Sequence, residues 1–118
     1  MVPGNQVLAD CRARLGLDLL SNTWNGVALW ALRHGPLRHS ELRTRVGSIS
    51  AKVLTETLRR LEYNGLLTRT AGKYALTPLG HSLLGPIELI AQWAHDHGDE
   101  VMEAQDRADA PASELRGV

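Results

Sequence analysis

Apolar residues recur at helical spacing in four segments of the first half of the chain. The clearest is residues 50–63, where Val53, Leu54, Leu58 and Leu61 form the apolar stripe of a predicted amphipathic helix. Further helices are predicted over residues 7–20, 24–34 and 39–46. Gly35-Pro36 and Gly47 are the stop signals of the second and third helices, and Asn64-Gly65 is that of the fourth.

The pattern changes after residue 65. Residues 66–70 and 73–76 resemble short strands, and the Ala71-Gly72 pair between them is compatible with a tight hairpin. Thr77-Pro78 predicts a helix N-cap followed by proline in the first turn. Gly85-Pro86 predicts a kink in this last long helix near Leu84, and a further exposed helix is expected over residues 99–108.

Four helices, a hairpin and another helix, in that order, predict a winged helix-turn-helix fold. The fold class is therefore mainly α with a small β-hairpin, flanked by N- and C-terminal dimerisation helices. We expect residues 1–98 to form the winged-helix and dimerisation domain. Residues 99–118 would form an acidic C-terminal extension that is partly helical or disordered.

Charge is separated along the chain although the total is zero. The 118 residues include 43% apolar and 22% charged residues, as in one folded domain. Residues 12–73 hold eleven Lys and Arg against four Asp and Glu, whereas residues 74–118 hold two against eight. A basic body attracts polyanions even in a neutral chain. Solvated helix faces explain the same charges equally well.

The outward side of the predicted helix 50–63 carries groups that can contact DNA. Arginine makes bidentate bonds to guanine, hydroxyl groups suit several base edges, and the amides of a helix N-terminus favour phosphate. Ala51 is expected nearer the core and is not counted among the contacts. The candidates are Ser50, Lys52, Thr55, Glu56 and Arg59. An ordinary amphipathic surface helix is the alternative.

Further candidates lie on either side of this helix in the sequence. Arg69 and Lys73 bracket the hairpin tip, where cations can meet phosphate or the minor groove. Arg38, His39 and Ser40 open the helix 39–46, at a position suited to phosphate contacts. Such contacts fix the register on DNA without reading its sequence.

An ordered series of residues resembles the HxlR-type family of bacterial winged-helix regulators, which are related to MarR proteins. The series covers about residues 11–97 and consists of Cys11, Leu19-Leu20, Trp24, Gly35-Pro36, Ser40-Glu41-Leu42, Ile49-Ser50, Lys52, Leu54-Thr55, Leu58, Leu61-Glu62, Gly65-Leu66, Arg69, Tyr74, Leu76-Thr77-Pro78-Leu79-Gly80 and Trp93. The hairpin is shorter here than the family's usual one. The resemblance implies homodimers that bind roughly palindromic operators in double-stranded DNA and repress or activate neighbouring genes; we expect a repressor.

The dimer interface is expected on the terminal segments. Residues 7–20 and 79–97 carry more apolar surface than the central helices can cover, and Leu83, Ile87, Ile90 and Trp93 are the candidate contacts. The resemblance also implies a redox role for Cys11, since matching cysteines in some relatives sense oxidants or electrophiles. Burial of this cysteine at the interface is the alternative. Trp24, Trp30 and Trp93 fit either packing or the stacking of an aromatic small-molecule effector.

Other function classes find little support in the sequence. His95-Asp96-His97 lacks metal-ligand spacing, because residues two apart on a helix point in different directions, so we expect no metal and no cofactor. No catalytic motif is present, so an enzyme is not expected. A single cysteine and the absence of a long apolar run favour the cytoplasm, with no membrane contact. The rival from another class is a dimeric protein-interaction adaptor that does not bind DNA.

Overall fold

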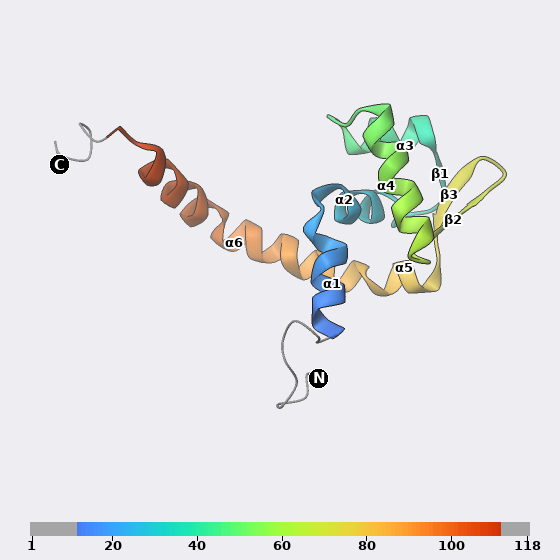
Figure 1. Ribbon diagram of the computed structural model, residues 1–118, viewed down its shortest axis with the longest axis horizontal. Coiled ribbons are helices and arrows are strands. Elements are labelled where there is room, and N and C mark those ends of the chain that lie inside the picture. Colours follow the sequence, from blue (N-terminus) through green and yellow to red (C-terminus); the bar gives the residue numbers. More distant parts are fainter. Residues whose placement is uncertain (1–11, 112–118) are drawn as a thin grey trace. The chain divides into compact units, whose positions relative to one another are not determined.

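The computed structural model describes residues 12–111, and the chain divides after Leu84 into two compact units. The first unit contains, in order, α1 (Arg12–Ser21), α2 (Thr23–Ala31), β1 (Leu37–Arg38), α3 (His39–Val46), α4 (Ala51–Tyr63), β2 (Leu67–Thr70), β3 (Lys73–Leu76) and α5 (Pro78–Ser82) (Figure 1). The second unit is built on α6 (Leu84–Asp109). The predicted fold class, mainly α with a small β part, is confirmed.

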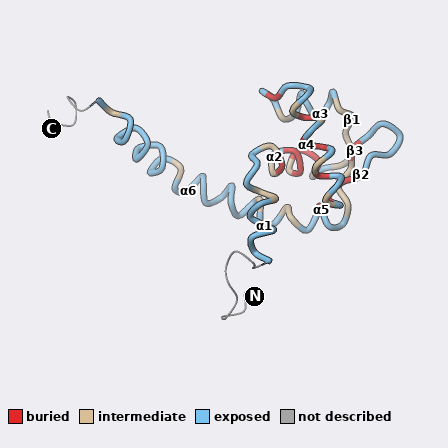
Figure 2. Tube along the Cα trace, in the orientation of Figure 1, coloured by how far each residue is buried: buried red, intermediate tan, exposed pale blue. Residues whose placement is uncertain are grey.

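Leucine forms most of the core of the first unit, as expected for a chain without phenylalanine. Buried positions concentrate on α2, on α4 and at the base of the sheet (Figure 2). The largest fully buried side chains are Leu29, Leu32, Leu42, Leu54, Leu58, Leu61, Leu67 and Thr57. The leucine stripe of α4 therefore fixes which side of this helix faces outward.

One buried polar network joins three helices of the first unit. Asn25 on α2 is 2% exposed, and its Nδ2 donates to the carbonyl oxygen of Leu19 on α1 at 2.8 Å. Its Oδ1 accepts from Nε and Nη2 of Arg60 on α4, at 3.3 and 3.2 Å. Arg60 Nη2 also donates to Thr57 Oγ1 at 3.4 Å. Arg60 is thus a structural residue, whereas its neighbour Arg59 is exposed.

Replacing Arg60 with alanine should destabilise the protein by about 1–3 kcal/mol, because Asn25 Oδ1 would be left buried without a donor. Arg59→Ala is the matched control, since it removes the same side chain from the exposed side of the same helix and should stay within about 0.5 kcal/mol of wild type. Urea denaturation of the two variants measures both free energies of unfolding. Equal stability of the two variants would contradict the structural role of Arg60.

The wing is a three-stranded antiparallel sheet in the order β1-β3-β2. The predicted hairpin is confirmed: Ala71 and Gly72 connect β2 to β3, with φ angles of 52° and 76°. Positive φ at both central residues is typical of the tight turns that match strand twist. Strand β1 was not predicted from the sequence; it pairs Leu37 with Tyr74 and Arg38 with Lys73. Two residues are too few to show the alternation of a strand.

Helix α6 extends over 26 residues and has no buried side chain. Its N-terminal boundary agrees with the predicted kink, because α5 ends at Ser82 and α6 begins at Leu84. The expectation of a separate helix from residue 99 is wrong, since α6 continues through Gly98; a single glycine inside a helix costs only about 1 kcal/mol. The expected domain boundary at residue 98 stays a prediction. No helix within residues 12–111 is long and apolar enough to cross a membrane.

Candidate nucleic-acid interface

Helix α4 presents a polar and cationic side opposite its buried leucines. Ser50 is the N-cap, and its Oγ accepts from the amide of Val53 at 3.1 Å. Lys52, Glu56 and Arg59 are all exposed, as predicted from the spacing of the leucines. None of these three side chains takes part in an ion pair among the described residues. The exposed side of α4 can therefore offer a hydroxyl group, an ammonium group and a guanidinium group to a ligand.

The expected position of Ala51 is wrong, because this residue is exposed. Ala51 is the first residue of α4, and the core at this end is instead filled by Ile49, which is 6% exposed. Helical spacing puts Ala51 on the same side of α4 as Leu54, but this side is buried at Ala51 only if the core extends to the first turn of the helix. Its small side chain leaves the N-terminal turn of α4 open to close approach.

His39 and Thr55 contact each other, although they are 16 residues apart. His39 is the first residue of α3 and Thr55 lies in the second turn of α4, and both are half-buried. The His39 Nε2 and Thr55 Oγ1 atoms are 3.0 Å apart. The structure thus brings together two candidate residues that the sequence analysis assigned to separate sites. Ser40, next to His39, is exposed.

The wing brings three candidate cations together. Arg38 in β1 pairs with Lys73 in β3, and its Nη1 lies 3.2 Å from the position that a Cβ atom on Gly72 would occupy. The guanidinium group of Arg69 in β2 lies over the ring of Tyr74, 5.4 Å from its centroid. Sequence reasoning placed Arg38 at the start of α3 alone, because β1 was not visible in the pattern. Because Arg38 comes from β1, the three-stranded wing carries one more positive charge than the β2-β3 hairpin alone.

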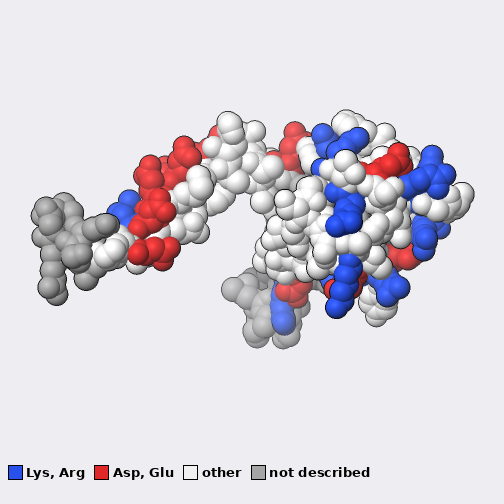
Figure 3. Space-filling model, turned by 90° about the horizontal axis from the view of Figure 1, so that it is seen from above, with Lys and Arg blue, Asp and Glu red and all other residues white. Residues whose placement is uncertain are grey.

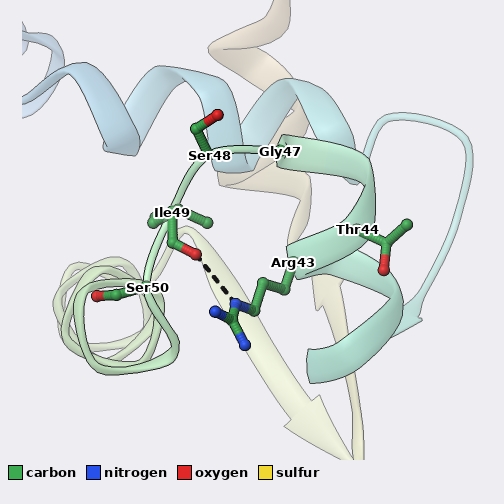
Figure 4. Close-up of a pocket in the computed structure, with 6 residues that line it drawn as sticks. All are labelled: Arg43, Thr44, Gly47, Ser48, Ile49 and Ser50. Atoms are coloured by element: carbon green, nitrogen blue, oxygen red, sulfur yellow. Dashed lines mark hydrogen bonds between the residues drawn. The ribbon is translucent and has the colours of Figure 1, made fainter.

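The turn between α3 and α4 contains a residue that the sequence analysis missed. Arg43 Nε donates to the carbonyl oxygen of Ile49 at 3.0 Å, and this bond links α3 to the turn (Figure 4). An open pocket lies beside the bond. The pocket is lined by Arg43, Thr44, Gly47, Ser48, Ile49 and Ser50. Arg43 and Arg45 occupy the last turn of α3, where cations complement the helix dipole. The place of Arg43 in the last turn of α3 is the sequence feature from which a cation close to Ser50 could have been predicted.

The two units differ in surface charge. Lys and Arg side chains gather on the first unit, whereas Asp and Glu dominate the C-terminal part of α6 (Figure 3). The acidic positions of that part are Asp96, Asp99, Glu100, Glu103, Asp106 and Asp109. The charge separation inferred from the sequence is therefore a difference between surfaces, and the candidate interface lies on the basic unit.

The remaining candidates have different environments. Leu83 and Ile87 are half-buried, and Ile90 and Trp93 are 54% and 56% exposed. Trp24 and Trp30 are half-buried, with Arg33 stacked 4.5 Å from the centroid of Trp30. Cys11 lies outside the described residues. Within residues 12–111, no cluster of His, Cys, Asp and Glu is arranged to hold a metal ion.

Comparison with known proteins decides the family. The model of the HxlR-like helix-turn-helix family matches residues 19–102, which include the turn, α4 and the wing. The chain belongs to the HxlR family. This confirms the resemblance inferred from the residues.

Similar proteins are known by sequence and by structure. The HTH-type transcriptional regulator YtfH of Escherichia coli is 34% identical to this HxlR-family chain over 110 residues, or 87% of each protein. The structure of a ytfH regulator from Salmonella typhimurium has a TM-score of 0.71 at 31% identity and covers 88% of this chain and 99% of that one. Quinone-bound YodB from Bacillus subtilis has a TM-score of 0.68 at 32% identity, covering 72% and 97%. These matches support the classification of this HxlR-family protein as a DNA-binding transcriptional regulator.

Proposed function

We propose that this HxlR-family protein is a repressor that binds a palindromic operator as a homodimer. The observation that carries the proposal is the exposed side of α4, where Lys52 and Arg59 stand opposite the buried Leu54 and Leu58. A helix of this kind enters the major groove, while a wing lies against the phosphate backbone. The role includes no catalytic step, cofactor or metal, and it would be carried out in the cytoplasm.

The homodimer is supported by the surface of α6. This helix has no buried residue, yet Leu89, Ile90, Trp93, Val101 and Met102 are large apolar residues that are each at least 40% exposed. Large apolar side chains that stay exposed along one helix favour an interface with a partner. In a homodimer with two-fold symmetry, the two α4 helices would read half-sites about 34 Å apart. Leu83, Ile87, Ile90 and Trp93 are the contacts that we assign to this interface.

A small-molecule effector is part of the proposal. YodB, which is similar to this chain, is known in a quinone-bound form. Here the candidate responding group is the thiol of Cys11, the single cysteine of the chain. Conjugate addition of the Cys11 thiolate to a quinone would form a C–S bond, and the ring would take up a proton and become a hydroquinone. Such an adduct on the N-terminal segment would change the dimer and so the spacing of the two α4 helices.

The test is a gel shift of the purified protein with the DNA upstream of its own gene at two salt concentrations, with and without 1,4-benzoquinone. The proposal predicts saturable binding of one fragment by two protein chains, weaker binding at higher salt, and release by the quinone. Dimers that bind no fragment specifically would contradict DNA recognition and favour the adaptor function. Binding that is unchanged by the quinone would contradict the effector alone.

A further inference from the structure

The hydroxyl group of Thr55 has two partners within the first unit. Thr55 Oγ1 lies 2.8 Å from the backbone carbonyl oxygen of Ala51, which can only accept a hydrogen bond. It also lies 3.0 Å from His39 Nε2. A hydroxyl group has one proton and two lone pairs. Because that proton is donated to Ala51, the His39 Nε2 atom must carry its own proton and donate it to Thr55.

This arrangement determines what Thr55 can offer to a ligand. Its proton and one lone pair are used within the protein, which leaves one lone pair on Oγ1 and the methyl group. Thr55 lies between the exposed residues Lys52 and Arg59 along α4 and is itself half-buried. On the side of α4 proposed to enter the groove, Thr55 can accept a hydrogen bond but cannot donate one.

Bases differ in what they present in the major groove. Adenine and cytosine each present an exocyclic amino group, N6 and N4, which donates a hydrogen bond. Guanine presents only the acceptors N7 and O6 on its major-groove edge. A hydroxyl group that can only accept therefore forms a hydrogen bond with the amino group of adenine or cytosine. It forms none with guanine, because N7 and O6 are acceptors too.

We propose that His39 is a positioning residue that holds Thr55 as a hydrogen-bond acceptor, so that the protein selects adenine or cytosine over guanine at one position of each operator half-site. This inference rests on the proposed DNA-binding function and adds a specificity rule to it. His39 is the first residue of α3 and Thr55 lies in α4, so both helices of the motif would contribute to the recognition of one base. Lys73 and Arg38 on the wing would contribute affinity without this preference.

The test measures binding of an operator panel, carrying each of the four base pairs at every position, by fluorescence anisotropy. Thr55→Val removes the hydroxyl group at nearly constant volume and should reduce discrimination at one position by roughly 3- to 10-fold, the worth of one hydrogen bond. His39→Phe should reduce discrimination at the same position, and His39→Gln, whose amide can donate, should restore it. The double variant His39→Phe/Thr55→Val should discriminate between the bases as well as Thr55→Val alone does, because His39 acts only through the hydroxyl group. Lys73→Ala, the control, should weaken all operators alike.

Unchanged base preference in His39→Phe, or additive effects of the two substitutions, would overturn the inference while leaving DNA binding in place. A wild-type protein that binds no operator would overturn both the inference and the proposed function. Nitrogen NMR of the free wild-type protein tests the same arrangement without any variant. The neutral imidazole of His39 should carry its proton on Nε2, and a proton on Nδ1 alone would overturn the inference.

Discussion

Replacing Lys52 and Arg59 together with alanine should reduce operator affinity by on the order of 100-fold or more. A guanidinium group that bonds a guanine contributes about 1–3 kcal/mol to recognition, and a homodimer would lose this contribution in both half-sites. Lys52 adds a charge that is lost in both protomers. Both side chains are exposed, so the fold should be unaffected. Fluorescence anisotropy at fixed salt measures the affinity, and thermal denaturation verifies the fold.

Arg107→Ala is the matched control for this prediction. It removes one exposed positive charge from α6, among acidic residues, and should leave operator affinity close to that of wild type. If the double variant and the control bind equally well, the exposed side of α4 does not contact DNA. The protein-interaction alternative would then be favoured.

Replacing Gly80 with alanine should cause the largest loss of stability among single substitutions outside the leucine core. A Cβ atom on this buried glycine would overlap the backbone carbonyl oxygen of Leu66 and stand 3.3 Å from Leu76 Cδ2. That carbonyl oxygen cannot move away cheaply, because it accepts from the amide of Thr77 at 3.1 Å. We expect a loss of about 3 kcal/mol in the free energy of unfolding, at the upper end for overpacking.

Gly16→Ala provides the comparison for Gly80→Ala. Gly16 lies inside α1 with nothing within 4 Å of its would-be Cβ, so alanine should raise stability by about 0.5–1 kcal/mol through its better helix propensity. Both variants are measured by urea denaturation. Similar effects in the two variants would show that α5 does not pack closely on the carbonyl group of Leu66.

Local signals were sufficient to predict most elements of the first unit. Helix α3 has the predicted bounds, and α4 begins one residue after its predicted start because Ser50 is its cap. The Thr77-Pro78 signal was also correct, since Thr77 Oγ1 accepts from the amide of Gly80 at 3.0 Å. Caps and turns depend on residues a few positions apart, and such short-range chemistry is visible in one sequence.

Contacts between distant residues could not be predicted. The bond between Asn25 and Arg60 joins residues 35 apart, and in the sequence Arg60 looks like one more surface cation beside Arg59. The pairing of Arg38 with Lys73 and the contact of His39 with Thr55 likewise arise only when α3, α4 and the wing pack together. For the candidate interface, the sequence therefore predicted the exposure of Lys52, Glu56 and Arg59 but neither that of Ala51 nor the bond that orients Thr55.

The most direct test of the account is methylation interference on the operator, comparing wild type with Arg59→Ala at a salt concentration low enough for both to bind. Methylation of guanine N7 adds a methyl group in the major groove, where Arg59 is proposed to bond the base. If Arg59 bonds this base, wild-type complexes exclude DNA methylated at one guanine in each half-site, and Arg59→Ala complexes tolerate methylation at that same guanine. An identical exclusion pattern for the two proteins, or none at any guanine, would contradict this bond.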